Sequence, residues 1–276
     1  MHPTPAPPAA RLSARGLTLA YERRTVVEGL DLDVPDGSFT VIVGPNACGK
    51  STLLRALARM LTPREGGVHL DGQLIGRYRA KEVARRLGLL PQSASAPDGI
   101  TVADLVARGR FPHQRFLRPW SAEDERAVAQ AMAATGVDVL AERAVDELSG
   151  GQRQRVWLAM ALAQETPVLL LDEPTTYLDI AHQIEVLDLC ARLHEEGGRT
   201  LVAVLHDLNH ACRYATHLVA MRAGRIEAQG APAQVVDAAL VERVFGLPCV
   251  VVPDPETGTP LVVPRRRGTA AIRTTD

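Results

Sequence analysis

The octapeptide G-P-N-A-C-G-K-S at residues 44–51 leaves few folds open to this chain, because it fits the pattern G-x-x-x-x-G-K-[ST]. A glycine-rich turn of this kind binds phosphate when a strand precedes it and a helix follows it, since its backbone N–H groups then point at the anion. Residues 38–43 have the composition of a strand, and residues 51–60 repeat apolar side chains at helical spacing. We therefore predict a phosphate-binding loop between them.

The residue types of this loop suggest their roles. Lys50 should reach the outer phosphates of a nucleotide, and the Ser51 hydroxyl should hold Mg²⁺. Lys50 and Lys81 are the only lysines among the 31 basic residues, which indicates that the chemistry requires a lysine here. Cys48 is expected close to the phosphates, where a bulky adduct on its thiol should block binding. The expected nucleotide-contacting residues are Gly44, Pro45, Asn46, Ala47, Cys48, Gly49, Lys50, Ser51 and Thr52.

A second pattern is the apolar run V-L-L-L at residues 168–171, followed directly by Asp172 and Glu173. Continuous aliphatic residues are typical of a buried parallel strand, and ligands bind at the carboxyl ends of such strands. Asp172 could hold Mg²⁺ there, and Glu173 could accept a proton from an attacking water. The alternative is a solvated acidic turn, with Pro174 ending the strand.

The pentapeptide L-S-G-G-Q at residues 148–152 precedes this strand. S-x-x-Q is a capping box, so these residues should begin a helix. A helix N-terminus attracts anions, and two glycines let a phosphate come close to the backbone. Both interpretations hold together, which makes Ser149, Gly150, Gly151 and Gln152 candidates for phosphate contact.

The order of expected elements predicts the fold. Strands at residues 15–20 and 38–43 and a hairpin at residues 68–75 come first, and the helical period then dominates residues 93–163. Strands return at residues 168–171 and 201–205, separated by a helix at residues 180–195. This alternation predicts an α/β fold in which helices cover both faces of a parallel sheet that carries the P-loop, with an N-terminal antiparallel β layer and an inserted helical subdomain.

We expect a disordered lead-in at residues 1–10, one domain at residues 11–250 with a helical subdomain at about 93–165, and a loosely packed tail at residues 251–276. The 46% hydrophobic content supports a sizeable core, whereas a net charge of −1 and 4% aromatic residues argue against nucleic-acid binding. No apolar stretch approaches the roughly 18 residues of a membrane span, and nothing resembles a signal peptide. The four cysteines are widely spaced, so we expect them to be reduced.

Taken together, the P-loop, the L-S-G-G-Q segment and the acidic strand end resemble the ABC ATPases along most of the chain. The resemblance implies a P-loop (RecA-like) ATPase core, so that residues 11–250 form an ABC ATPase domain, with ATP and Mg²⁺ as cofactors. It further implies a head-to-tail homodimer, in which residues 149–152 of one subunit cover the γ-phosphate bound to the other. It also implies that Gln92 senses Mg²⁺ and the attacking water, so the expected metal-contacting residues are Ser51, Gln92 and Asp172. The expected catalytic residues are Glu173, His206 and Gln92.

Three further roles follow from the same resemblance. His206 matches a switch histidine at the γ-phosphate, Tyr21 an aromatic residue against adenine, and Asp179 a segment that crosses to the other subunit. Alternatives remain for two of them. His206, His210 and Cys212 have a spacing that could ligate a metal. Tyr21 could be an ordinary strand residue.

A narrower resemblance rests on R-G-R-F-P-H-Q at residues 108–114, D-E-P-T-T-Y-L-D-I at residues 172–180, H-D-L-N-H-A-C-R-Y at residues 206–214 and the segment at residues 258–264. These stretches are similar to the ATPase subunits of importers for ferric siderophores, especially of the ferric enterobactin type. Haem and vitamin B12 importers use similar ATPases and remain alternatives for the cargo.

The resemblance implies two copies beneath a transmembrane permease dimer, at the cytoplasmic face of the membrane, with an extracytoplasmic substrate-binding protein outside. Residues 99–113 are expected to contact the permease, with Arg110 among the contacting residues. The alternatives from other classes are a non-transport ABC ATPase acting on DNA or the ribosome, and a P-loop kinase. A kinase would leave Ser149 to Gln152 and His206 unexplained.

Overall fold

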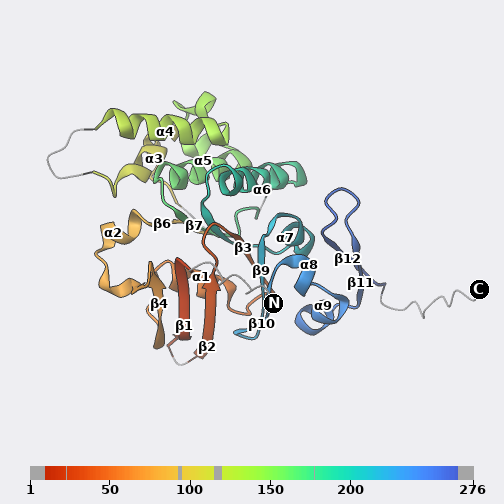
Figure 1. Cartoon of the computed structure of the whole chain (residues 1–276). Helices are drawn as coiled ribbons and strands as arrows, with labels where there is room; N and C mark the ends of the chain where they lie inside the picture. Colours follow the sequence, from red (N-terminus) through yellow and green to blue (C-terminus); the bar gives the residue numbers. More distant parts are fainter. Residues whose placement is uncertain (1–9, 23, 93–94, 115–119, 177, 267–276) are drawn as a thin grey trace, which may run out of the picture.

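The computed structural model describes residues 10–22, 24–92, 95–114, 120–176 and 178–266, and the expected lead-in at residues 1–10 lies almost wholly outside them. A six-stranded sheet runs through the centre of the molecule in the order β10-β9-β3-β8-β7-β6 (Figure 1). Its strands are β3 (Phe39–Val43), β6 (Leu87–Leu90), β7 (Val168–Asp172), β8 (Thr200–Val204), β9 (His217–Arg222) and β10 (Arg225–Gly230). All pairs are parallel except β9 with β10, which confirms the predicted α/β architecture.

Every residue of β3, β7 and β8 is buried, as their aliphatic sequences predict for strands covered on both faces. Alternate side chains of β3 enter different cores: Val41 and Val43 pack with one cluster and Ile42 with the other. The Val41 face is covered by helices α5 (Gly150–Ala163), α6 (Ile180–Glu195), α7 (Leu208–Tyr214) and α9 (Ala238–Phe245). The Ile42 face packs on α1 (Lys50–Leu57) and a second sheet.

That second sheet is the predicted N-terminal antiparallel layer, in the order β2-β1-β4-β5. It contains β1 (Leu12–Tyr21), β2 (Arg24–Val34), β4 (Glu65–Leu70) and β5 (Gln73–Leu74), and it is followed by the turn η1 (Ile75–Arg77) and the helix α2 (Ala80–Ala84). The sequence analysis assigned no strand to residues 24–34. Register shifts between β1 and β2 interrupt the alternation of buried and exposed residues, which weakens that signal.

The helical block between β6 and β7 stands to one side of the central sheet (Figure 1). Its elements are α3 (Val102–Ala107), η2 (Arg108–Arg110), α4 (Ala122–Thr135), η3 (Asp138–Leu140), η4 (Val145–Glu147) and α5. Arg110 is 1% exposed. Its guanidinium donates hydrogen bonds to Asp124 at 2.8 Å and to Glu165 at 2.7 Å. The expectation that Arg110 contacts a permease is therefore wrong, because this side chain is inside the subdomain.

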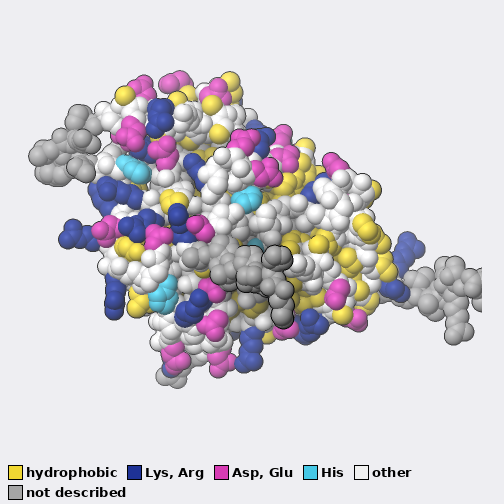
Figure 2. Space-filling view, viewed as in Figure 1, with side chains coloured by type: hydrophobic (Ala, Val, Ile, Leu, Met, Phe, Trp, Pro, Cys, Tyr) yellow, Lys and Arg dark blue, Asp and Glu magenta, His cyan; other side chains and the backbone are white. Residues whose placement is uncertain are grey.

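The C-terminal region is more ordered than its composition suggests. After α8 (Pro232–Val235) and α9, an antiparallel hairpin forms from β11 (Cys249–Pro253) and β12 (Pro260–Pro264). The expected boundary at residues 250 and 251 falls inside β11, and Val262 is buried, so the described part of this tail is packed onto the domain. Hydrophobic side chains gather over these elements in the space-filling view (Figure 2). Within the described residues, no helix combines the length and hydropathy that a membrane span requires.

Candidate nucleotide-binding site

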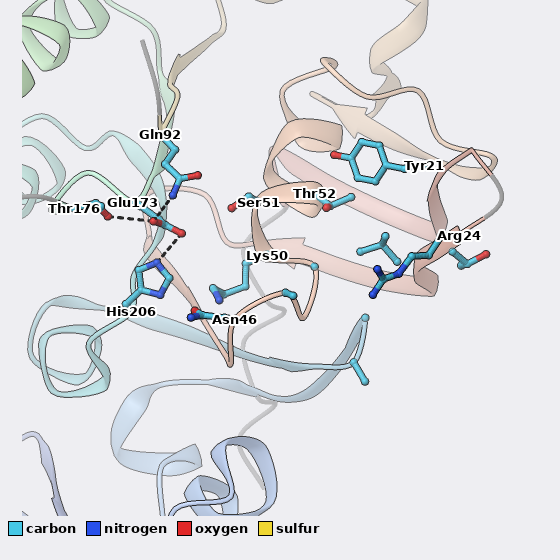
Figure 3. Close-up of a pocket in the computed structure, with 16 residues that line it drawn as sticks. Tyr21, Arg24, Asn46, Lys50, Ser51, Thr52, Gln92, Glu173, Thr176 and His206 are labelled. Atoms are coloured by element: carbon cyan, nitrogen blue, oxygen red, sulfur yellow. Dashed lines mark hydrogen bonds and ion pairs between the residues drawn. The ribbon is translucent and has the colours of Figure 1, made fainter.

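A cavity of about 850 Å³ opens where the carboxyl ends of the central strands meet the start of α1 (Figure 3). Ten residues named from the sequence line it: Tyr21, Asn46, Ala47, Gly49, Lys50, Ser51, Thr52, Gln92, Glu173 and His206. The sequence analysis missed six others: Arg24, Thr25, Val26, Thr176, Ala223 and Gly224. The cavity thus joins the glycine loop, three strand ends and one edge of the antiparallel sheet.

The glycine loop has backbone conformations that favour glycine at two positions. Gly44 and Gly49 have φ values of 154° and 109°, and a Cβ at Gly44 would collide with the carbonyl of Met221. Lys50 is buried and donates to the carbonyl oxygens of Gly44 at 2.8 Å and Pro45 at 3.0 Å. The loop therefore surrounds the ammonium group of Lys50, which lies in the wall of the cavity.

Cys48, by contrast, does not line the cavity. Its side chain is buried in the core that α1 shares with the antiparallel sheet, and Gly224 donates its backbone N–H to the Cys48 carbonyl at 2.9 Å. Burial raises the pKa of the Cys48 thiol. An adduct on this sulfur would have to displace core side chains before it could reach a bound nucleotide.

The Glu173 carboxylate collects three polar partners (Figure 3). It accepts a hydrogen bond from Gln92 Nε2 at 2.6 Å and one from Thr176 Oγ1 at 3.1 Å. His206 Nε2 lies 2.6 Å from its other oxygen. Glu173 also has a φ of 55°, an uncommon conformation for a residue with a side chain. This arrangement holds the carboxylate in one orientation at the cavity wall.

The strand order explains why these groups meet. Gln92 follows β6, Glu173 follows β7 and His206 follows β8, and the three strands are parallel neighbours. Their carboxyl ends therefore lie at the same edge of the sheet. Thr176 comes three residues after Glu173, and the hydroxyls in D-E-P-T-T were a signal that the sequence analysis did not use.

Asp172 lies directly beside this group and is buried. It accepts a hydrogen bond from the Ser51 hydroxyl at 2.9 Å. Burial raises the pKa of the Asp172 carboxyl, and the charge of Glu173 adds to the increase. Ser51, Asp172 and Gln92 together offer hydroxyl, carboxylate and amide oxygens, the kind of ligand that Mg²⁺ prefers, so these residues fit a Mg²⁺ site.

Four more lining residues come from two hairpins. Tyr21 and Arg24 are partners across the β1–β2 turn, and Ala223 and Gly224 form the turn between β9 and β10. Tyr21 is exposed at the mouth of the cavity, with Arg24 beside it (Figure 3). Because Tyr21 is 43% exposed and lines the cavity, its ring is accessible to a ligand there.

The L-S-G-G-Q segment and Asp179 are absent from the residues described as lining this cavity. Ser149 and Gln152 form the predicted capping box at the start of α5, with hydrogen bonds of 3.1 and 3.3 Å. Asp179 caps α6, and the hydrogen bonds from the His182 amide and ring lower the pKa of its carboxyl. The two segments are neighbours, because a Cβ at Gly151 would lie 3.6 Å from the His182 ring.

The alternative metal site at His206, His210 and Cys212 does not form. Cys212 is buried in the core, whereas His206 points to Glu173. Among the residues that the structure describes, no group of three or more His, Cys, Asp or Glu side chains could hold a metal ion. His206 therefore belongs to the polar group around Glu173.

Comparisons with known proteins give the family. The profile of the family described as ABC transporter matches residues 27–176. The ferric enterobactin transport ATP-binding protein FepC of Escherichia coli K12 is 60% identical over 258 residues, covering 94% of this chain and 95% of that protein. The probable siderophore transport system ATP-binding protein YusV of Bacillus subtilis is 53% identical, covering 95% of each chain. The hemin import ATP-binding protein HmuV of Streptomyces coelicolor is 45% identical, covering 96% of this chain and 95% of that protein.

Solved structures agree. An ABC transporter described as of metal-chelate type, in an inward-facing conformation, superposes with a TM-score of 0.80 at 28% identity, covering 93% of this chain and 98% of that one. The dimeric structure of the bacterial ABC transporter cassette MJ0796 has a TM-score of 0.72 at 26% identity, covering 80% of this chain and 98% of that one. The chain therefore belongs to the ABC transporter family and is one of its ATPase subunits.

Proposed function

We propose that this chain hydrolyses ATP to drive the uptake of a ferric siderophore across the cytoplasmic membrane. The observation that carries the proposal is the 60% identity to the ferric enterobactin subunit FepC over 94% of this chain. Relatives named for achromobactin and petrobactin, at 55% and 52% identity, support the same class of cargo. The haem relative at 45% identity is more distant, and vitamin B12 is the other cargo that an importer of this kind could serve.

In the proposed mechanism, ATP occupies the 850 Å³ cavity with its adenine against Tyr21. Lys50 leaves the carbonyls of Gly44 and Pro45 for the outer phosphates, which the backbone N–H groups of residues 46–52 also contact. Ser51, Gln92 and Asp172 would hold Mg²⁺, whose charge offsets the charge that develops on the phosphate oxygens.

Glu173 is the proposed general base. A water between its carboxylate and the γ-phosphate would transfer a proton to Glu173 as the oxygen attacks phosphorus. Gln92 and His206 already bond to this carboxylate, so the base is oriented before the substrate arrives. When ATP is bound, His206 can turn from Glu173 to the γ-phosphate.

The proposed assembly is a homodimer with two ATP molecules at its interface. Ser149, Gly150, Gly151, Gln152 and Asp179 do not line their own cavity, so they are free to contact the nucleotide of a second subunit. The dimeric MJ0796 cassette supports this proposal. The pair would dock on a permease dimer at the cytoplasmic face of the membrane and would receive cargo from an extracytoplasmic substrate-binding protein. The domain would extend from residue 11 through the C-terminal hairpin, with its helical subdomain at about residues 93–165.

Replacing the general base tests the mechanism. Glu173→Gln keeps a hydrogen-bonding side chain, so ATP should still bind, while turnover should fall by about 10² to 10⁴. Binding of a fluorescent ATP analogue and release of inorganic phosphate measure the two effects. Glu196→Gln, at an exposed position on the end of α6, is the control and should have normal turnover. Near-normal hydrolysis by Glu173→Gln would remove this residue from the role.

Uptake by intact cells tests the cargo. Cells lacking the gene should fail to import one iron-loaded siderophore, and wild type but not Glu173→Gln should restore uptake. Haem and cobalamin uptake should stay normal. A defect in haem or cobalamin uptake alone would instead assign that cargo and reject the siderophore proposal.

A further inference from the structure

Helix α7 begins two residues after His206, so the placement of this helix sets the placement of the imidazole. The His206 side chain is 45% exposed, so packing alone does not fix its orientation. Asp207 caps α7 by accepting the amide N–H of His210 at 2.8 Å. His206 therefore directly precedes the capping residue of α7, so a shift of this helix would also shift His206.

Helix α7 is anchored on the C-terminal hairpin by Asn209. Its amide nitrogen donates to the Val262 carbonyl at 3.2 Å, and its amide oxygen accepts the Val262 N–H at 2.7 Å. One side chain thus satisfies both backbone groups of a buried β12 residue that lies 53 positions away. An asparagine side chain has the donor and the acceptor that this double contact requires.

The hairpin end that faces α7 is itself well fixed. The Asp254 carboxylate accepts the backbone N–H groups of Glu256 at 2.9 Å and Thr257 at 3.0 Å. Its other oxygen accepts from Arg213 of α7 at 3.0 Å, and Arg213 also pairs with Glu256 at 3.1 Å. The hairpin therefore holds α7 at two points, one turn of helix apart.

We propose that Asn209 is a positioning residue of the ATPase, which anchors α7 on the β11–β12 hairpin and thereby orients His206 against Glu173 and the γ-phosphate. The inference rests on the proposed function, because Asn209 can affect ATP hydrolysis only if His206 acts at the γ-phosphate. The hairpin that the composition marks as a loose tail is then part of the catalytic scaffold. A small displacement of a group at the reacting phosphate lowers turnover strongly, even when its cause lies outside the cavity.

A double-mutant cycle on the purified full chain tests this proposal. Asn209→Ala should lower kcat for ATP about tenfold and leave KM within about twofold, because the cavity walls stay in place. In a His206→Ala background, Asn209→Ala should lower kcat by less than about twofold further, because its effect acts through the missing imidazole. Single-turnover phosphate release gives kcat for the slow variants. Normal kcat in Asn209→Ala, or the same tenfold loss in both backgrounds, would overturn the proposal.

Two further variants separate positioning from folding. Asn209→Asp keeps an acceptor for the Val262 N–H and loses the donor, so its kcat should lie between those of wild type and Asn209→Ala. Val263→Ala changes the neighbouring β12 residue, which is 41% exposed, and should have the kcat of wild type. If Val263→Ala loses as much kcat as Asn209→Ala, the hairpin acts through general stability and the proposal fails. The proposed function fails by a different result, namely absence of ATP hydrolysis in the wild type or normal siderophore uptake without the gene.

Discussion

Two adjacent carboxylates at the end of β7 have different environments, and the difference suits different tasks. Glu173 accepts hydrogen bonds from Gln92 and Thr176, and His206 lies beside its other oxygen. Asp172, by contrast, is buried and accepts one hydrogen bond, from Ser51. Burial and the neighbouring charge of Glu173 raise the pKa of Asp172. A buried anion of this kind destabilises the folded protein until a cation offsets it.

Asp172→Asn should therefore stabilise the nucleotide-free protein. The asparagine oxygen can still accept from Ser51, while the charge is removed. Since the folded-state pKa of Asp172 is raised, its anion opposes folding at pH 7, and this cost fades as the pH falls toward the ordinary aspartate range. We expect the Tm at pH 7 to rise by about 2–4 °C, corresponding to about 1 kcal/mol in a chain of this length. Calorimetry would measure this increase.

The same variant should lose the stabilisation that wild type gains from Mg²⁺ with ATP, because a metal ligand is missing. Asp98→Asn, at an exposed position, is the control and should change neither quantity. A lower Tm for Asp172→Asn would contradict the view that its charge is a cost to folding.

Among the elements, the helical subdomain depends on a buried ion network. Arg110 of η2 bonds to Asp124 of α4, to Glu165 and, at 2.9 Å, to the carbonyl of Ala163, which is the last residue of α5. One guanidinium thus joins three elements that are distant in sequence. Arg110 is the buried cation of this network, whereas the other contacts of its two carboxylates are with Ser121 for Asp124 and with the exposed Arg126 for Glu165.

Arg110→Ala should reduce the free energy of unfolding by about 3–5 kcal/mol, because removing one partner of a buried ion pair leaves the other charge uncompensated. Urea unfolding, monitored by circular dichroism, measures this free energy of unfolding. Arg108→Ala, at an exposed position two residues earlier, should change stability by less than about 0.5 kcal/mol. Wild-type stability of Arg110→Ala would mean that water replaces the guanidinium at little cost.

At the scale of the whole molecule, the segments at residues 149–152 and 178–182 lie together but do not line the cavity of their own chain. Gly150 has no neighbouring atom within 4 Å of the place where a Cβ would be. This part of the surface is therefore open and presents the N-terminus of α5. It is suited to meet a nucleotide held by a second copy.

Glu173→Gln with ATP should therefore run as a dimer in size-exclusion chromatography with light scattering, because slow hydrolysis preserves the ATP-bound pair. Adding Gly150→Trp should return the protein to a monomer, since the indole has room in one chain but would separate two. ATP binding to the monomer should stay within about threefold of that of Glu173→Gln, because Gly150 lies outside the cavity. A dimer that persists with Gly150→Trp would contradict the head-to-tail arrangement.

Much of the core of the fold follows from local sequence. The aliphatic run at residues 168–171 predicts a buried strand, and β7 has all its residues buried. The helix expected at residues 180–195 is α6 with the same bounds. Parallel strands place their carboxyl ends at one edge, so the convergence of Gln92, Glu173 and His206 could be expected before any coordinates.

Other features depend on long-range contacts that local patterns do not report. Arg24 and Gly224 enter the cavity because two hairpins from different sheets meet there. An arginine is expected at the surface, and Arg110 can lie inside the subdomain because it pairs with Asp124 and Glu165.

The hairpin at residues 249–264 has a turn rich in Pro and Thr, and local sequence does not report its packing on α7, which rests on the contacts of Asn209 with Val262 and of Arg213 with Asp254. The sequence by itself determined the loop chemistry, the strand ends and the family, because these depend on neighbours within a few residues. The tertiary structure decided which charges are buried and what holds His206, because those depend on groups that only folding brings together.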